Sequence, residues 1–569
     1  MFEWITNLLA PDEGRGGVLG SPKALGAFMA ELDAQPPVRV LRMAAQRFDA
    51  LPEASLVRAE VRRSVMRLDE YAQRALRECW ESMLSGPRGL TLSEDMWASL
   101  RGYYRSVHAR YASFLRGPTK PKPASEQEQA DAIVIAARAM SALAKHMLLL
   151  HMRYRQADRL VWWHVRDLLE WAEAHGHYTA ALELYPDTGA QTTFERELLT
   201  ALLIEVAPTS NLLPAQVQAL DRLLRLHDGA FRMSSSHDDQ ATPFGYDPAK
   251  GKAPQRWLKQ LPVYPGLRFF GVGSAYVALC AEKESAVSPQ KVPGWLASTR
   301  CSSEDYRDLL ERLVSAWSLR PPARRHRREP CAGEILVAHD WSEIRRLVKF
   351  SELARAGRSN SYDSTNIYGV DSSPRAPKDR TMDDPTLKKP VVIPEPLANL
   401  LSFERTVADE AIETWSLTDS SEVGLGAVAR SPRPWVKVGM LIAFRDPDSP
   451  DWQLALIRRL NCSDVGDLTV GMTRVKGTVA SARLRLGAGG VHRHPALGGN
   501  DPTAIEYDAL VVRDAEPSLF IPAGVFDRSW KYTLYWDNRQ DVVKMEKSLE
   551  CGLNFERVHT TAVEAMRAA

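Results

Sequence analysis

The chain has 569 residues, which is too long for one ordinary domain, so about three folded units are expected. Hydrophobic residues make up 44% and charged residues 25% of the chain, a composition typical of packed globular proteins. The formal net charge of +2 gives no electrostatic basis for a dedicated nucleic-acid-binding protein, so no DNA partner is expected.

The cysteines and the apolar runs indicate the compartment. The six cysteines are scattered and form no CxxC pair, which argues against a disulfide framework or a structural zinc site. The apolar stretch at the N-terminus is short and lies beside acidic residues, so it does not have the pattern of a secretory signal. No apolar run of about 18 residues is evident, so no membrane insertion is expected. These features predict a cytoplasmic protein.

Residues 1–228 are predicted to form a helical domain. Ser125 with Glu128 makes a capping box before a long helical stretch that runs to about residue 175. Large apolar side chains recur at helical spacing near its end and predict a buried stripe of Leu160, Trp163, Leu168 and Trp171.

Beyond residue 228 the spacing of hydrophobic residues is no longer helical. Residues 229–319 are predicted to be an irregular connecting segment with short strands, ended by a helix that Ser302 and Asp305 cap. From there to residue 560 short runs of period two, separated by turn residues, predict a β-barrel or sandwich. An insertion at 355–395, rich in Ser, Pro, Asp and Lys, is predicted to be disordered. The fold class is therefore predicted to be α+β.

One turn carries the most specific local pattern, Asp419-x-Ser421-x-x-Gly424, between predicted strands at 412–417 and 425–429. Asp and Ser exchange hydrogen bonds in tight turns, and Gly permits a positive φ or a close backbone approach. Many surface turns contain these residue types, so a purely structural turn is the alternative interpretation.

An arginine-rich segment precedes the first predicted strand of this region, 333–339. It supplies Arg324 and Arg328 at a spacing of four. The arginine fork donates to phosphate oxygens and to guanine edges, and it stacks on bases. A solvated linker is the alternative, and Arg320 makes the register of the pair ambiguous.

The order of these motifs resembles the PilZ family. The turn is followed by WVKVGMLIAFR and then by WQLALIRRLNCSDVGDLTVGMTRV, as in that family. The resemblance covers about 320–560, and its far end is similar to the β extension of longer PilZ-type proteins. It implies a six-stranded barrel that binds cyclic di-GMP through Arg324, Arg328, Asp419, Ser421 and Gly424.

The spacing of the two motifs departs from the family. In the family the two motifs usually lie a few tens of residues apart, whereas Arg328 and Asp419 are separated by about 90 positions. The entropic cost of closing a loop grows only logarithmically with its length, so the insertion is compatible with the barrel.

The resemblance implies a bacterial, non-enzymatic cyclic di-GMP receptor that relays nucleotide state to a protein partner through its helical half. No catalytic residue, metal ligand or cofactor is expected, because the GxSxG, HExxH and Walker patterns are missing and the histidine pairs lack acidic or Cys partners at ligand spacing. One alternative is a PilZ-fold adaptor whose degenerate site binds no nucleotide. Another is an enzyme with an unrecognised site.

Overall fold

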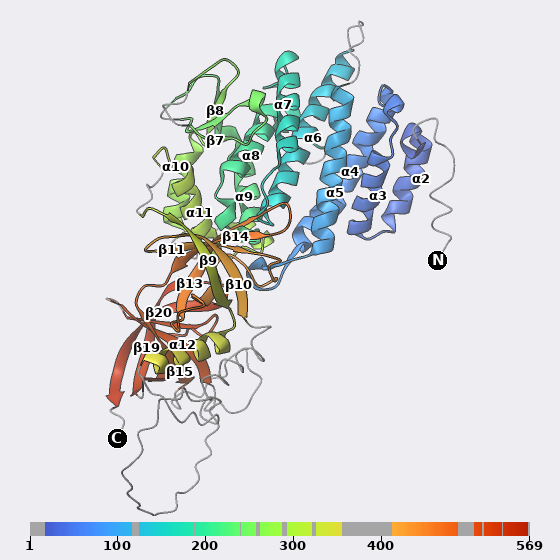
Figure 1. Cartoon of the computed structure of the whole chain (residues 1–569). Helices are drawn as coiled ribbons and strands as arrows, with labels where there is room; N and C mark the ends of the chain where they lie inside the picture. The colour runs from blue at the N-terminus through green and yellow to red at the C-terminus, as the bar shows by residue number, and fades with distance from the viewer. Residues whose placement is uncertain are drawn as a thin grey trace, which may run out of the picture. The chain divides into compact units, whose positions relative to one another are not determined.

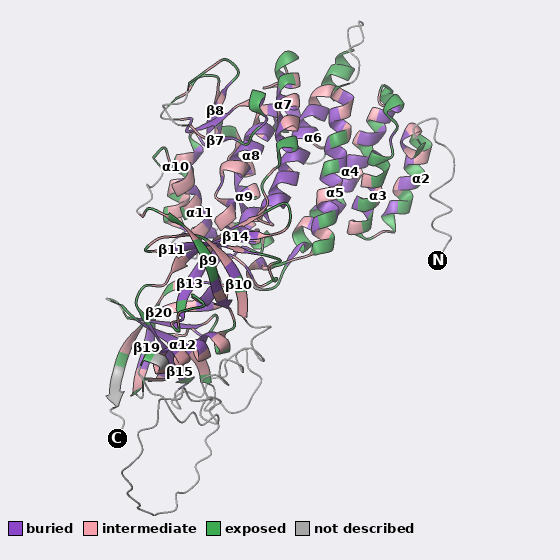
Figure 2. Cartoon of the chain, viewed as in Figure 1, coloured by how far each residue is buried: buried purple, intermediate pink, exposed green. Residues whose placement is uncertain are grey.

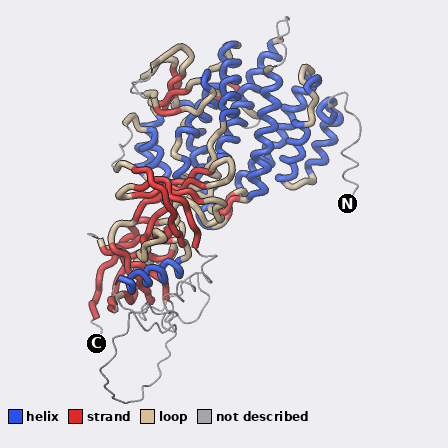
Figure 3. Tube along the Cα trace, in the orientation of Figure 1, coloured by secondary structure: helices blue, strands red, loops and turns tan. Residues whose placement is uncertain are grey.

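The computed structural model divides the chain into two compact units, Met1–Ala323 and Arg324–Ala569. Helices dominate the first unit, and two closed β-barrels make up most of the second (Figure 3). The predicted α+β fold class is confirmed. The structure describes residues 17–116, 125–186, 189, 191–238, 241–257, 262–286, 293–320, 326–355, 412–486, 506–514, 517–537 and 539–566.

The first unit is built from helices that lie side by side (Figure 1). Capping side chains begin several of them, and the predicted capping box of Ser125 and Glu128 and the cap at Ser302 are both confirmed. The helices are α2 (Pro22–Asp33), α3 (Pro37–Asp49), α4 (Ala59–Ser82), α5 (Glu94–Leu115), α6 (Glu126–His151), α7 (Arg159–Ala174), α8 (Phe194–Val206), α9 (Pro214–Leu226), α10 (Ala275–Ser285) and α11 (Ser303–Trp317).

Helix α6 lies in the core of this unit, in contact with α5, α7, α8 and α9 (Figure 2). Within the described part of the chain, it alone is long and apolar enough to cross a membrane, although no such run was expected from the sequence. The packed helices bury 83% of its apolar window. A helix that is apolar on all sides suits such a buried position in a folded core.

The buried face of α7 differs from the predicted stripe. Leu160 is 60% exposed, and Trp163 and Trp171 are only partly buried. The ring of Trp163 packs instead against Gly251, where an added Cβ would lie 2.5 Å from it. Because Trp162 and Trp163 are adjacent, the sequence pattern does not decide which of them faces the core. In the structure, tertiary packing buries Trp162. The buried residues are Val161, Trp162, Val165, Leu168, Leu169 and Ala172.

Residues 229–319 lie within the first unit and contain a four-stranded sheet as well as α10 and α11. The strand order of this sheet is β5-β8-β6-β7. The pairs β1-β2 and β3-β4 form two separate two-stranded sheets. The strands are β1 (Leu84–Ser85), β2 (Thr91–Leu92), β3 (Leu182–Glu183), β4 (Gln191–Thr192), β5 (Arg232–Ser234), β6 (Phe244–Tyr246), β7 (Gln255–Arg256) and β8 (Arg268–Gly271).

The first barrel closes with strand order β10-β11-β14-β13-β12-β9, and all of its described pairs are antiparallel. Its inward side chains are apolar, as the period of two predicts. The strands are β9 (Glu329–Ala338), β10 (Ile412–Ser420), β11 (Gly424–Ala429), β12 (Leu441–Arg445), β13 (Gln453–Cys462) and β14 (Leu468–Arg474).

The predicted β extension is a second closed barrel, in the order β15-β16-β17-β20-β19-β18. Closure pairs every strand on both sides over part of its length, which removes the free edges of an open extension. The strands are β15 (Thr478–Leu486), β16 (Glu506–Arg513), β17 (Ser518–Pro522), β18 (Lys531–Trp536), β19 (Arg539–Cys551) and β20 (Phe555–Met566).

Helix α12 (Trp341–Arg355) follows β9 and was not predicted. Ile344, Leu347 and Val348 on its inner face share one hydrophobic core with residues of both barrels. The helix ends where the predicted insertion begins. The polar composition of the insertion obscured the short apolar pattern of the helix. Its last residue, Arg355, is the first residue of the predicted disordered stretch, and the rest of that stretch lies outside the described residues.

The turn between β19 and β20 holds the second barrel to the first. The side chain of Asn554 accepts a hydrogen bond from the N–H of Leu441 at 2.8 Å and donates to its carbonyl at 3.0 Å. The indole of Trp341 donates to the main-chain oxygen of Asn554. Asn554 thus supplies Leu441, which is fully buried, with the two bonds that a neighbouring strand would otherwise provide.

We expect Asn554→Ala to destabilise the barrel unit by ~1–3 kcal/mol, because the N–H and carbonyl of Leu441 lose their partners in a buried position. Urea unfolding measures the loss, and hydrogen exchange at Leu441 should accelerate. Asn461→Ala on β13, whose side chain is partly exposed, is the control. Equal stability of the two variants would contradict this role of Asn554.

Candidate functional site

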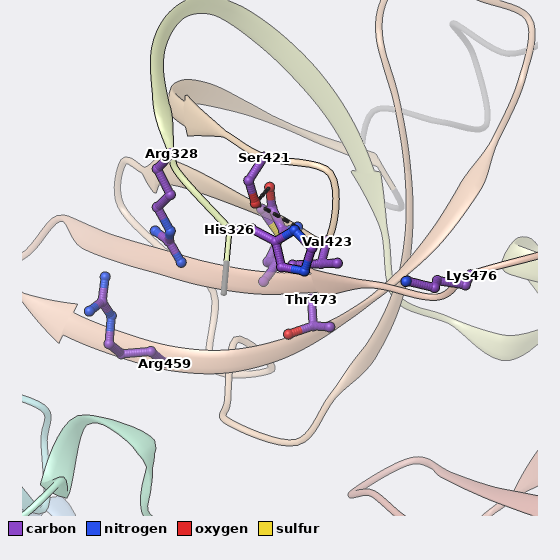
Figure 4. A pocket seen from close by; sticks show the side chains of 9 residues that line it. His326, Arg328, Ser421, Val423, Arg459, Thr473 and Lys476 are labelled. Carbon is purple, nitrogen blue, oxygen red and sulfur yellow. Dashed lines mark hydrogen bonds between the residues drawn. The ribbon is translucent and has the colours of Figure 1, made fainter. Parts of the chain in front are cut away.

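A cavity of about 530 Å³ opens on the first barrel, beside the β10–β11 turn and strands β13 and β14 (Figure 4). Its volume lies within the range of small-molecule sites. The residues that line it come from the lead-in to β9, the turn, the two strands and the connection after β14. They are His326, Arg328, Ser421, Val423, Gly424, Arg459, Met472, Thr473 and Lys476.

Ser421 and Gly424 hold the β10–β11 turn in shape. The N–H of Ser421 donates to the carbonyl of Gly424 at 2.8 Å, and the N–H of Gly424 donates to the Ser421 hydroxyl at 3.1 Å. Gly424 does not have a positive φ, so of its two predicted roles only the close approach applies. An added Cβ would lie 2.7 Å from the carbonyl oxygen of Met472 on β14.

The structure brings Arg328 and Asp419 together across 91 positions of sequence. Arg328 Nη1 donates to Asp419 Oδ1 at 2.9 Å. Asp419 follows a register shift in β10 and stands opposite Gly426, where a Cβ would collide with its carboxylate. Gly426, which the sequence motif did not include, therefore makes room for the carboxylate that orients Arg328.

The predicted site residues differ in their relation to the cavity. Arg328, Ser421 and Gly424 line the cavity, and Asp419 contacts it through Arg328. Arg324 lies outside the described residues.

Arg459 is a cavity residue that the sequence motifs did not identify. It follows a register shift between Ile457 and Arg459 in β13 and lies beside Gly471 of β14, where an added Cβ would be 3.3 Å from the Arg459 Cβ. Its neighbour Arg458 is used differently, in an ion pair with Glu550 at 2.6 Å. Simple alternation along the strand would not reveal this assignment, because a bulge changes which side chain faces which side.

Lys476 is the second such residue. It lies on the short connection between β14 and β15, which joins the two barrels. Val475 before it donates to the carbonyl of Leu454 in the first barrel, at 2.9 Å. Gly477 after it has φ +98 and packs closely on the carbonyl of Arg513 in the second. The exposed lysine is thus anchored on both sides.

The cavity lining is basic. Arg328, Arg459 and Lys476 supply three cationic side chains, and among the described residues none that lines the cavity is acidic. Two carboxylates offset part of the positive charge: Asp419 pairs with Arg328, and Glu422 lies 3.3 Å from His326. Such a cleft attracts anions and suits phosphate oxygens in particular.

The lining offers recognition groups more than reactive ones. The Ser421 hydroxyl is engaged by the amide and the carbonyl of Gly424. Within the described ranges, His, Cys, Asp and Glu side chains form no group of three or more that could hold a metal ion.

Comparison with known families concerns the other unit. Residues 23–238 match the family described as the N-terminal domain of the cyclic-di-GMP receptor FimW. The match spans α2 to α9 of the helical unit, less than half of the chain, and does not include the barrels. No curated protein matches the chain.

Substitutions of Gly424 and Gly426 are expected to have different effects. Gly424→Ala should lower the free energy of unfolding of the barrel unit by ~1–3 kcal/mol, because its Cβ meets the main chain of β14. Gly426→Ala should displace the Asp419 carboxylate and with it the Arg328 guanidinium. Urea unfolding tests the first effect, and the NMR signal of the Arg328 side chain tests the second.

Gly102→Ala on α5 is the control for both glycine variants, because an added Cβ there meets nothing within 4 Å. It should leave the barrel unit unchanged. Wild-type stability of Gly424→Ala would refute the close-approach argument.

Proposed function

We propose that the protein is a non-enzymatic receptor for cyclic di-GMP, which binds in the cavity of the first barrel. The observation that carries the proposal is the lining formed by the described residues: it has three cationic side chains, no carboxylate, and a Ser/Gly turn at one side. The match of the helical unit to the N-terminal domain family of a cyclic-di-GMP receptor supports the same ligand from independent residues. We further propose that the first barrel is of the PilZ type, on the order of its motifs and its six-stranded closure.

The ligand's chemistry suits these groups. Its two phosphates each carry a negative charge, which Arg328, Arg459 and Lys476 would meet with charge-assisted hydrogen bonds. Its guanine edges accept hydrogen bonds from arginine forks, and its purine faces stack on guanidinium planes. Asp419 orients Arg328, so its contribution is to pre-organise a cation that would otherwise sample many rotamers.

The helical unit is proposed to relay the bound state to a protein partner, in a cytoplasmic setting. If the cavity binds no nucleotide, an adaptor that binds protein alone is the function that remains.

Calorimetric titration with cyclic di-GMP tests the proposal. Arg328→Ala and Arg459→Ala should each weaken binding by ~10–100-fold, because each removes charge-assisted bonds of about 1.5–3 kcal/mol. Asp419→Ala should weaken it less, since the arginine remains. Arg324→Ala reports whether that residue also contacts the ligand.

Two neighbouring arginines serve as controls of equal charge. Arg327 is exposed and does not line the cavity, and Arg458 pairs with Glu550 instead. Arg327→Ala and Arg458→Ala should bind within about twofold of wild type at moderate salt. Excess GTP should not compete. If wild type gives no heat at high micromolar ligand, the receptor function is wrong. If Arg459→Ala binds as tightly as Arg458→Ala, the ligand does not occupy this cavity.

A further inference from the structure

A second concentration of positive charge lies in the helical unit. Four arginines form it: Arg101 and Arg105, one turn apart on α5, and Arg153 and Arg155, in the turn that follows α6. We call these four side chains the arginine cluster.

Trp97 anchors the arginine cluster. The Cζ of Arg153 lies 3.9 Å and the Cζ of Arg101 lies 5.4 Å from the centroid of its ring. The ring itself is fixed, because the indole is 5% exposed and its Nε1 donates to the carbonyl of Leu149 at 2.8 Å. Two guanidinium groups are therefore packed at one fixed aromatic ring.

The carboxylates nearby do not balance the arginine cluster. Glu94 forms an ion pair with Arg153, and Asp158 caps α7 by accepting the N–H of Val161 at 2.9 Å. With the described residues, Arg101, Arg105 and Arg155 form no ion pair within 4.0 Å. The Nε of Arg101 is buried without a hydrogen-bond partner among them.

His146, which lies near Arg101, adds no negative charge. Burial, helped by Arg101, lowers the pKa of His146 to about 4, so it is neutral at physiological pH. Burial and the nearby charges of Arg155 and Arg105 lower the pKa of Arg101, in keeping with like charges held close together. Crowded cations of this kind gain most from an external anion, because its approach relieves repulsion as well as forming new bonds.

We propose that the arginine cluster is a docking site for an acidic peptide segment of a partner protein. Carboxylates match the planar arginine fork in pairs, which selects acidic side chains as the contacts. Leu160 is two positions after Asp158 in the chain and is 60% exposed, and we assign it the apolar contact of the same peptide segment. The proposal concerns the helical unit and does not depend on nucleotide binding in the cavity.

The size of the arginine cluster favours a peptide over larger polyanions. Specific duplex DNA binding typically uses about 6–10 phosphate contacts along an extended surface, more than four side chains supply. A membrane-surface helix needs a continuous apolar face, whereas Leu160 is the one large apolar side chain of α7 that is exposed in the described part of the chain.

Fluorescence polarisation on the full chain tests the proposal, with a labelled glutamate-rich peptide that carries one leucine and with its glutamine counterpart. Wild type should bind the glutamate peptide and not the glutamine peptide. Arg101→Ala with Arg155→Ala should weaken binding at least about tenfold. Arg63→Ala with Arg67→Ala, on the exposed face of α4, removes equal charge elsewhere and should change binding less than about twofold.

Thermal unfolding of each variant verifies that the helical unit is folded. Arg155→Lys keeps the charge but not the planar fork, so it should bind more weakly than wild type and more tightly than the double variant of Arg101 and Arg155. Equal binding by the two double variants would overturn the proposal, as would equal binding of the glutamate and glutamine peptides. Tighter, cluster-dependent binding of duplex DNA or of phosphatidylserine vesicles would replace the peptide with that polyanion.

Discussion

The candidate site depends on one contact, the hydrogen-bonded ion pair between Arg328 and Asp419. A partly exposed pair of this kind adds little to stability, and its value here is geometric. It holds the lead-in to β9 against the β10–β11 turn, so that a cation from well before the long insertion lines the cavity beside a turn that follows the insertion. Gly426 makes this possible, since any larger side chain would occupy the position of the carboxylate.

The rest of the second unit keeps that arrangement rigid. Helix α12 shares its core with both barrels, and Asn554 bonds to the main chain of β12 from the second barrel. Two cavity residues also adjoin the second barrel: Arg459 is next to Arg458, which pairs with Glu550, and Lys476 lies on the connection to β15. An anion bound in the cavity would therefore lie close to residues that join the barrels.

The helical unit has its own internal constraint. The carboxylate of Asp69, 1% exposed, accepts hydrogen bonds from Tyr103, Tyr111 and Tyr185. Arg138, equally buried, bonds to Glu70 on the same helix as Asp69. A satisfied polar network of this kind orients the helices that carry it, including α5, which carries Arg101 and Arg105 of the arginine cluster.

The sequence by itself determined the fold class, the helix caps and the turn that borders the cavity, because each depends on local periodicity or on side chains three or four positions apart. The Asp419, Ser421 and Gly424 turn could be recognised for that reason, whereas Arg328 was singled out by an order of motifs that resembles the PilZ family. Arg459, Lys476 and Gly426 could not, since a strand bulge, the junction of two barrels and a cross-strand contact decide their roles. The phase of α7 and the burial of α12 likewise depended on which neighbours packed against them. Tertiary structure alone decided these features, because they arise from contacts between segments that are distant in the chain.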